Sequence, residues 1–408
     1  MREIMIDYLA KLPPLTDFER ELIGRKVDVD AKYKLPSTVT YCKKCVISNQ
    51  RPRITFDSEG VCSACRYWEK KKSAIDWSAR ERELKELCDR YRRNDGAFDV
   101  LVPSSGGKDS VYVAWELKTK YGMHPLTMTW APHLYTEIGI RNFQAHIHAG
   151  LDNVCYTANG IVHRRMTRLS TIEIGDPFQP FIYGQTYLPL KVALGHGIGL
   201  IMDGENGESE YGGDVSTESK TGFTAKDAEE FWLSSFPLSH WKDRGFTDRD
   251  LEIYSAPNYE SLQKSNIERH FYSYYRDWRP QSHYYYCMEN TNFAPNPKGR
   301  SEGTFSKYAS LDDQIDPYHY YFALLKFGMA RATSDAAHEI REGLMEREEA
   351  VQLVKRYDAE MPSEQSLRVF LEYVGLTVEQ LNDVMDRWRN TRLWSGMGAS
   401  SELLYQVS

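Results

Sequence analysis

Apolar and polar residues alternate along the middle of the chain in a way that predicts strands and helices in turn. From residue 98, FDVLVPSS and HPLTMTWAP are short apolar runs typical of buried strands, and the segment between them has the spacing of a helix that ends near Gly122. The pattern continues with a helix at 136–150, a strand at 153–158, a helix through 191–197 and a strand at 197–206. Strands that alternate with helices pair in parallel through right-handed crossovers, so this order predicts an α/β fold with a doubly wound, mainly parallel sheet.

The two ends of the chain have different patterns. Residues 1 to about 40 predict a helical extension with proline breaks, and a capping box at Ser78–Glu81 predicts the start of a further helix. Beyond residue 333 the chain is helical, and a second capping box at Thr377–Gln380 precedes an apolar stripe formed by Leu381, Val384, Met385 and Trp388. We therefore predict three regions: an N-terminal extension with a cysteine module (1–95), an α/β domain (96–332) and a C-terminal helical region (333–408).

Two parts of the α/β region lack helical periodicity. The runs HFYSYYRDW (270–278) and HYYYCMEN (283–290) are rich in aromatic residues, which favours later strands, with tyrosines 284–286 in the core or an interface. Residues 213–265 are polar and aromatic without a clear period, so we expect an insertion there.

Composition and charge are those of a soluble globular protein. The 408 residues are 41% hydrophobic and 27% charged, which argues against disorder. The net charge of -7 and the pI of about 5.9 disfavour a nucleic-acid partner, which is usually bound by a basic face. There is no run of 18 apolar residues, and the first residues, MREIMIDYLAKLPP, lack the apolar core of a signal peptide. We therefore expect a cytoplasmic protein with no membrane contact.

Four of the seven cysteines form the pair of motifs C-K-K-C and C-S-A-C. Their spacing, C-x2-C-x16-C-x2-C, is close to that of zinc ribbons, and the predicted ligands are Cys42, Cys45, Cys62 and Cys65. Four thiolates leave no open position on tetrahedral zinc, so we predict a structural site; an iron–sulfur cluster is the alternative. The other three cysteines are expected in the core: Cys88, Cys155 and Cys287.

A loop rich in glycine and serine, SSGGKDS at 104–110, follows the first predicted strand. A glycine pair between a strand and a helix lets backbone N–H groups converge on an anion, and the helix dipole adds positive potential. The loop is not the G-x-x-x-x-G-K-[ST] motif, because Lys108 is followed by Asp109 rather than by a hydroxyl residue. We therefore predict a phosphate site of another class at the carboxyl end of this strand.

Further candidate residues follow later strands. The segment GENGESEYGG comes after the apolar run LIMD, and its Glu205, Asn206, Glu208 and Glu210 could coordinate magnesium, hold sugar hydroxyls or orient ammonia. Arg300, Lys307 and Arg331 are candidates for binding a phosphate or a carboxylated sugar. His133, His146 and His148 form no recognisable ligand set, so we expect ordinary helix or surface roles for them.

The loop S-G-G-K-D-S resembles the S-G-G-x-D-S motif of the PP-loop ATP pyrophosphatases, in which it binds the pyrophosphate that leaves when a substrate oxygen attacks the α-phosphate of ATP. The segments PFIYGQ (181–186), GENGESEYGG (204–213), TFSKYASLDDQID (304–316) and 319–343, with the cysteine module, are similar to the N-acetyl sugar amidotransferase family. That family is associated with acetamidino sugars of bacterial surface glycans, such as pseudaminic- and legionaminic-type acids and the O-antigen mannuronates of lipopolysaccharide.

The resemblance implies roles for individual residues and for cofactors. It implies ATP and Mg²⁺ beside the predicted Zn²⁺, and an N-acetylated sugar, free or nucleotide-linked, as the acceptor. The implied catalytic residues are Lys108, Asp109, Glu205 and Lys307. The implied ATP-binding residues are Ser105, Gly106, Gly107, Lys108, Asp109, Ser110 and Thr129. The implied acceptor-binding residues are Asn206, Glu208, Tyr211 and Arg331.

Several alternatives stay open at the level of sequence. Residue 2 is arginine rather than a catalytic cysteine, and no glutaminase nucleophile pattern is present, so ammonia would come from a separate glutaminase or from solution. A PP-loop enzyme that thiolates tRNA is the second hypothesis, although no C-x-x-C motif follows residue 65. The third is a zinc-dependent assembly protein that binds ATP without turnover.

Overall fold

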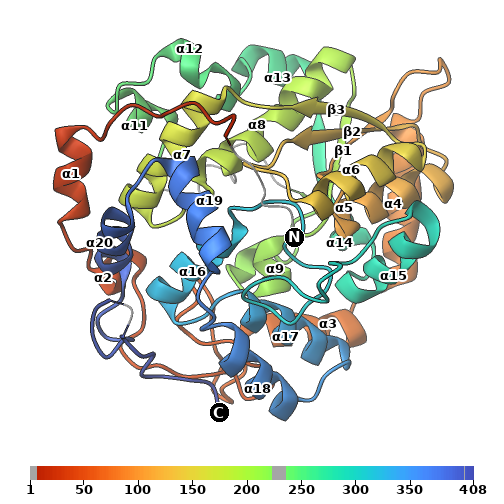
Figure 1. The fold of residues 1–408 in the computed structure, drawn as a ribbon. Helices are drawn as coiled ribbons and strands as arrows, with labels where there is room; N and C mark the ends of the chain where they lie inside the picture. The colour runs from red at the N-terminus through yellow and green to blue at the C-terminus, as the bar shows by residue number, and fades with distance from the viewer. Residues whose placement is uncertain (1–6, 223–235, 399) are drawn as a thin grey trace.

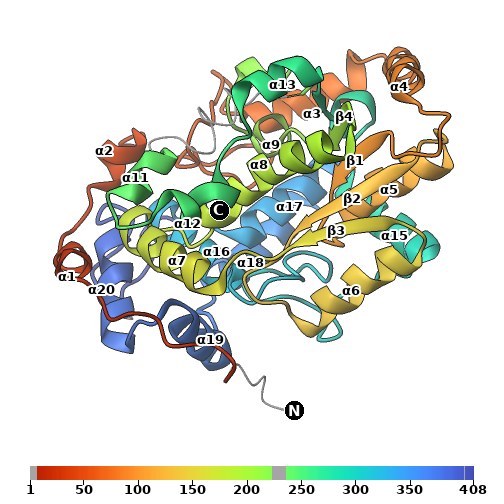
Figure 2. The same ribbon diagram turned by 90° about the horizontal axis from the view of Figure 1, so that it is seen from above.

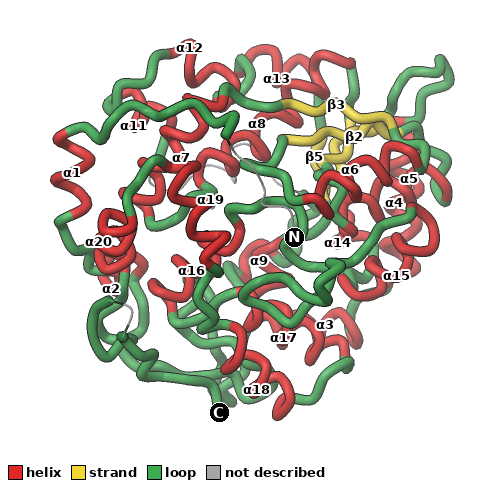
Figure 3. Tube along the Cα trace, in the orientation of Figure 1, coloured by secondary structure: helices red, strands yellow, loops and turns green. Residues whose placement is uncertain are grey.

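A five-stranded, all-parallel sheet forms the centre of the molecule. The computed structural model describes residues 7–222, 236–398 and 400–408. Leu101 in one central strand lies in register with Leu126 on one side and Ile201 on the other. The α/β fold and the four strands predicted between residues 98 and 206 are confirmed. In spatial order the strands are β3 (Asp152–Tyr156), β2 (Pro125–Trp130), β1 (Val100–Pro103), β4 (Leu200–Asp203) and β5 (Glu268–Phe271). Figure 1 labels β3, β2 and β1, and Figure 3 shows the sheet in yellow.

Helices cover both faces of the sheet, as Figure 2 shows from above. Leu84, Val113 and Tyr272 belong to the core on one face, and Met166 and Tyr187 belong to the core on the other. Burial on both faces explains why β1 and β4 are apolar runs rather than alternating ones. The first face carries α4 (Trp77–Tyr91), α5 (Lys108–Thr119), α6 (Glu137–His148), α14 (Tyr272–Tyr275) and α15 (Pro280–Thr291); the second carries α7 (Gly160–Ile174) and α8 (Gln179–His196).

The strand predicted at 283–290 is wrong, because this segment lies within α15. Tyr284, Cys287 and Thr291 are buried at helical spacing, and Pro280 occupies the start of the helix, where its fixed φ is favourable. Aromatic composition favoured a strand, but packing against α5 decides the conformation. The prediction for 270–278 is only partly confirmed, since β5 ends at Phe271 and α14 follows.

The structure also tests the two predicted capping boxes and the predicted burial of three cysteines. Helix α4 is capped by Asp76, which accepts a hydrogen bond from the backbone N–H of Ala79 at 3.0 Å, so the predicted capping box at Ser78 is wrong. Cys155 is exposed because β3 is an edge strand, whereas Cys88 and Cys287 are buried as predicted. The capping box at Thr377 and the buried stripe that follows it are confirmed.

The N-terminal extension and the C-terminal helices share one apolar core. Leu15 and Ile23 pack in the same cluster as Phe322, Phe370 and Trp388. Figures 1 and 2 both show the first helix of the chain beside the last. The helices of this core are α1 (Asp17–Ile23), α2 (Val29–Tyr33), α16 (Asp316–Phe327), α19 (Glu364–Val374) and α20 (Val378–Trp388).

The cysteine module packs against a second set of C-terminal helices. Its α3 (Ser63–Ser73) contacts α9 (Gly207–Tyr211), and its four cysteines lie in one core with alanines of α17 (Arg331–Glu342) and α18 (Arg347–Tyr357). The described part of the predicted insertion is mostly helical, and its residues 223–235 lie outside the described residues. It contains η1 (Val215–Thr217), α11 (Leu238–Lys242), α12 (Asp248–Leu251), η2 (Glu252–Tyr254) and α13 (Tyr259–Ser265). Within the described chain, every helix is too short or too polar to cross a bilayer.

We predict that Trp388→Ala destabilises the protein by about 3–5 kcal/mol, because it removes a large buried ring. Trp388 is fully buried, and its indole N–H donates to the carbonyl of Ile172 at 2.9 Å, which ties α20 to α7. Urea unfolding of the variant measures this loss. Val378→Ala on the same helix is the control, since Val378 is 45% exposed and its loss should cost less than about 1 kcal/mol.

Candidate functional site

The loop 104–110 leaves the sheet where the strand order reverses. β1 lies between β2 and β4, and the crossovers of a doubly wound sheet diverge there, which creates a crevice at the carboxyl ends of the strands. Gly106 has a φ of 89°, and a Cβ there would lie 2.7 Å from the Cα of Phe143 in α6, so only glycine fits. Gly107 caps α5, and a Cβ there would meet only Ser105 Oγ, at 3.5 Å. The start of α5 therefore has room for an anion beside its backbone N–H groups.

Two cavities flank this loop and share Ser105, Gly107 and Asp109 as lining residues. The larger, of about 410 Å³, extends from the loop over the ends of β2 and β4 and has apolar walls that include Met128 and Trp130. The smaller, of about 140 Å³, is lined by all of the residues from Ser105 to Asp109 and by residues that follow α15 in the chain, including Tyr308, Asp312 and Arg331. The predicted phosphate-loop residues Ser105, Gly106, Gly107, Lys108, Asp109 and Ser110 therefore all line one or both cavities.

The carboxylate of Asp109 is held from two sides. Lys108 Nζ lies 2.5 Å from its Oδ2, and His283 Nδ1 lies 2.9 Å from its Oδ1. Burial disfavours ionisation of Asp109, but the Lys108 charge and the His283 hydrogen bond outweigh it and hold the pKa of Asp109 well below its usual range. Asp109 is therefore a fixed anion at the mouth of both cavities.

His283 is enclosed by aromatic rings and by backbone. Its ring stacks on Tyr112 with centroids 4.1 Å apart and meets Trp278 edge-on at 4.3 Å. The backbone N–H of Arg279 donates to His283 Nε2 at 3.4 Å, so the proton of the neutral ring lies on Nδ1, from which it is donated to Asp109. Burial lowers the pKa of His283, which favours this neutral form.

Glu205 is a second carboxyl group in the larger cavity. Burial and the nearby charge of Asp109 raise the pKa of Glu205 to about 7. The Tyr211 hydroxyl lies 3.5 Å from Glu205 Oε1, at the limit of a hydrogen bond. Two carboxyl groups that repel each other beside the loop form a place where a cation would be stabilised.

The remaining predicted residues lie elsewhere. Thr129 is buried and donates to the Ser104 carbonyl at 2.5 Å, so it supports the loop from below. Lys307 is exposed, with its ammonium 5.1 Å from the ring centre of Tyr284, and it does not line the cavities beside the loop. Arg300 pairs with Glu360 at 2.6 Å. Arg331, by contrast, lines the smaller cavity and donates to the Tyr320 hydroxyl at 2.7 Å.

Asn206 and Glu208 hold the segment 204–213 in place rather than line these cavities. The Asn206 side chain caps α9 and donates to the Thr217 carbonyl at 3.1 Å. Glu208 accepts from Arg53 Nε at 3.0 Å and from the backbone of Asp214 at 2.7 Å. The cysteine module thus supports the chain immediately after Glu205.

Sequence reasoning missed two residues that shape the site. His283 was placed in a predicted strand, and only a helix brings it with Cys287 onto the face that packs against α5. Arg269 of β5 binds both oxygens of Asp203, at 2.6 and 2.9 Å, and closes one side of the larger cavity. The helical spacing of His283 and Cys287 was the available signal, and nothing in the sequence singled out Arg269.

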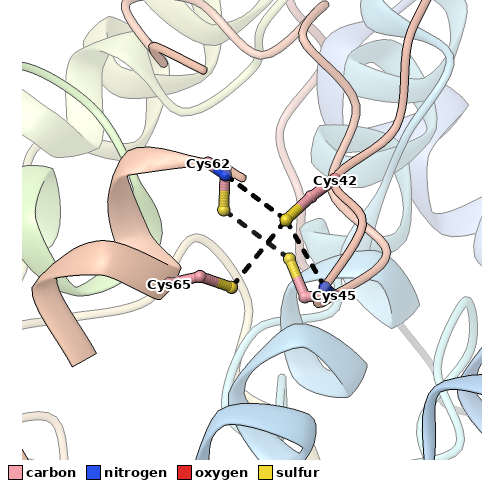
Figure 4. Close-up of side chains that lie close together, drawn as sticks. All are labelled: Cys42, Cys45, Cys62 and Cys65. Atoms are coloured by element: carbon pink, nitrogen blue, oxygen red, sulfur yellow. Dashed lines mark hydrogen bonds between the residues drawn. The ribbon is translucent and has the colours of Figure 1, made fainter. Parts of the chain in front are cut away.

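The four predicted metal ligands come together as a buried cluster. All four sulfur atoms lie within 4.8 Å of one another, and none of the cysteines forms a disulfide (Figure 4). The sulfurs of Cys42 and Cys65 are 3.9 Å apart and those of Cys45 and Cys62 are 3.7 Å apart. Tetrahedral zinc with bonds of about 2.3 Å places sulfurs about 3.8 Å apart, so the cluster fits one zinc ion.

Hydrogen bonds to sulfur also fit metal-bound thiolates. Cys42 Sγ accepts backbone N–H groups from Lys44 at 3.4 Å, Cys45 at 3.5 Å and Cys62 at 3.3 Å. Such donors stabilise negative charge on sulfur. An iron–sulfur cluster distributes its cysteines over separate iron atoms and needs wider sulfur spacing, so the geometry favours a single ion.

The site therefore belongs to an α/β protein with a glycine-rich loop beside two cavities at the switch point of a parallel sheet and a separate four-cysteine cluster. Residues 302–404 match the family model described as LPS biosynthesis protein WbpG-like, C-terminal domain. A search of the curated proteins finds no match. The match supports a role in the biosynthesis of lipopolysaccharide and its sugars, and the matched segment contains Arg331 at the smaller cavity.

We predict about one zinc ion per chain and its loss in Cys42→Ser, because three thiolates and a serine hydroxyl bind zinc weakly. Metal analysis of protein purified without oxygen measures both. Cys155→Ser is the matched control and should keep the metal, since Cys155 is exposed and outside the cluster. Iron with sulfide in the wild-type protein would contradict the choice of zinc, and a folded protein without metal would contradict the site.

Proposed function

We propose that the chain is an ATP-dependent amidotransferase of the PP-loop pyrophosphatase type, which converts the N-acetyl group of a bacterial surface sugar into an acetamidino group. The observation that carries this proposal is the S-G-G-K-D-S loop at the switch point, open to a cavity of about 410 Å³ with Asp109 and Glu205 in its walls. The family match of residues 302–404 supports the sugar class.

The first chemical step is adenylation of the amide. The acetamide oxygen attacks the α-phosphorus of ATP, a new P–O bond forms, and the bond to pyrophosphate breaks. The amide nitrogen gives up its proton, which the pyrophosphate can take up, and the product is the O-adenylated imidate. The loop N–H groups, Lys108 and Arg331 take up the charge that develops on the leaving pyrophosphate. The apolar wall formed by Met128, Trp130 and Ile182 fits a purine ring.

Asp109 and Glu205 would hold Mg²⁺, which neutralises phosphate charge when bound. The fit rests on the mutual repulsion of these two carboxyl groups, which a cation between them relieves. Since the pKa of Glu205 is raised to about 7, its ionised form, and with it cation binding, is favoured as the pH rises through this value.

The second step replaces oxygen by nitrogen. Ammonia attacks the carbon of the O-adenylated imidate, the C–O bond breaks, and AMP leaves with the oxygen of the former amide. The amidine keeps the proton gained from ammonia, which makes it a strongly basic cation. Ammonia comes from a separate glutaminase or from solution; both routes give the same products.

The alternative, a tRNA-thiolating enzyme, needs a reactive cysteine near the loop. Cys287 contacts the loop, since its thiol donates to the Lys108 carbonyl at 3.1 Å, but it is buried, and burial raises its pKa to about 12. A thiol of this kind is a poor nucleophile at neutral pH. The geometry therefore favours the amidotransferase.

We predict that N-acetyl sugars incubated with ATP, Mg²⁺ and ammonium at raised pH give AMP and pyrophosphate in equal amounts. Mass spectrometry should show a product in which NH has replaced one oxygen. ADP and phosphate as products would contradict the nucleotide chemistry. AMP formation stimulated by unmodified tRNA, and by no N-acetyl sugar, would favour the thiolase instead.

Two loop variants serve as a matched pair in this assay. Gly107→Ala should fold normally, because its methyl group has room, yet lose about 100-fold in AMP formation, because a methyl group on this cavity wall would hinder the proposed phosphate. Gly106→Ala should lower the melting temperature, since its methyl group would collide with the backbone of Phe143. Equal stability of these two variants would show that the loop geometry is wrong.

We also predict that His283 is a positioning residue for Asp109. His283→Phe removes the hydrogen-bond donor to Asp109 and should raise the pKa of this carboxyl group. The acid limb of the pH–rate profile for AMP formation should then move to higher pH, and the rate should fall about tenfold. His283→Asn keeps an N–H donor near the position of Nδ1 and should restore the wild-type profile. Identical profiles for the two variants would contradict the role.

A further inference from the structure

A third cavity, of about 600 Å³, lies on the far side of the segment 308–312 from the phosphate loop. It is bordered by the starts of α6, α16 and α19 and by the chain from Asn296 to Glu302. More than half of its lining residues belong to the segment 302–404 that matches the lipopolysaccharide-biosynthesis domain. No residue of the loop 104–110 and none of the four clustered cysteines lines this cavity, and the proposed ATP chemistry does not need it.

Side chains connect the third cavity to the phosphate loop. Ser310 and Leu311 line both the third cavity and the small cavity beside the loop. Tyr320 lines the third cavity, and its hydroxyl accepts the 2.7 Å hydrogen bond from Arg331, which lines the small one. A ligand against Tyr320 is therefore one hydrogen bond away from a residue beside the loop.

Some polar side chains of this cavity already have hydrogen-bond partners within the protein, and others can still bind a ligand. Glu302 binds the hydroxyls of Ser363 and Ser366 at the start of α19, and Asp313 accepts from His133 at 2.7 Å. Glu137 and Asp316 have no side-chain hydrogen bond or ion pair within the described chain. Burial and the charges of Asp313 and Asp312 raise the pKa of Asp316 to about 8, so near neutral pH it is largely protonated and can both donate and accept.

These walls have the chemistry of a sugar site. Carboxyl groups and the amide of Gln365 can accept from and donate to ring hydroxyls, while Tyr320, Pro317 and Val369 offer apolar surface to the faces of the ring. The cavity over the loop, of about 410 Å³, is needed for ATP in the proposed function. The third cavity, of about 600 Å³, is large enough for a monosaccharide with a substituent.

We propose that the third cavity binds the pyranose ring of the N-acetyl acceptor, with Glu137, Asp316 and Gln365 as its hydroxyl partners. This inference rests on the proposed function for the identity of the ligand. The ring then lies against residues of the segment 302–404, and Ser310 and Leu311, which line both cavities, form the wall between it and the small cavity beside the loop. The sugar is thus recognised in one cavity, and ATP is activated in others beside the loop.

The test combines kinetics with binding. Gln365→Trp fills the cavity from an exposed position on α19, and Asp316→Leu removes both carboxyl oxygens with little change in size. Each should raise the KM for the sugar about tenfold or more, while the KM for ATP stays within about twofold. Glu364→Gln is the matched control, because Glu364 is the exposed neighbour of Gln365 and does not line the cavity; it should behave as the wild type.

Sugar binding without turnover separates failure of this proposal from failure of the proposed function. Saturation-transfer NMR is recorded with wild type and Gln365→Trp, using N-acetylated sugar acids in one arm and nucleotide-linked N-acetyl hexoses in the other. Binding that Gln365→Trp abolishes supports the site even if no AMP forms, and the arm that binds identifies the class of acceptor. Binding that persists in the variant, or an absence of binding in both arms, overturns the site.

Discussion

The turn at Gly106 is the constraint on which the candidate site depends. The chain passes from β1 into α5 within a few residues while its backbone touches α6, and only a residue without a Cβ fits there. This close approach directs the start of α5 toward the crevice at the switch point, where helix N–H groups have no intrahelical partners. Ser104 fixes the same turn, since its hydroxyl accepts from Ser110 at 2.9 Å and from the Gly106 N–H at 3.3 Å.

A buried ion pair joins the cysteine module to this site. Lys71 of α3 and Glu210 of α9 are 1% and 3% exposed, and their charged groups lie 3.0 Å apart. Removal of one partner would leave an uncompensated buried charge. This would lower the stability of the protein more than the removal of a charged residue at the surface. Cys62 and Cys65 lie at the start of α3, the same helix carries Lys71, and Lys71 pairs with the helix that begins two residues after Glu205. A zinc ion bound by the four cysteines would therefore stabilise the geometry of the candidate site from a distance.

Charges of both signs meet around the loop. Lys108 and Arg331 line the small cavity, Glu205 lines the larger one, and Asp109 lines both. An anion alone would be repelled by the two carboxyl groups, and a cation alone would be repelled by the two bases. A phosphate together with a divalent cation would satisfy both sets, and the proposed ATP chemistry brings this combination to the loop.

The sequence by itself determined the features that depend on residues close to one another along the chain. The apolar run of β1, the loop SSGGKDS and the two C-x-x-C motifs depend on contacts within a few positions, so the parallel sheet and the four-cysteine cluster could be predicted, while the anion site at the loop stays a prediction. Composition misled at residues 283–290, where packing against α5 overrode the preference of tyrosines for strands. Only the tertiary structure decided the partners of Asp109, since His283 lies 174 residues away along the chain. It also decided that Glu208 pairs with Arg53 instead of lining a cavity, because the folded chain, and no local pattern, brings two charges 155 residues apart into contact.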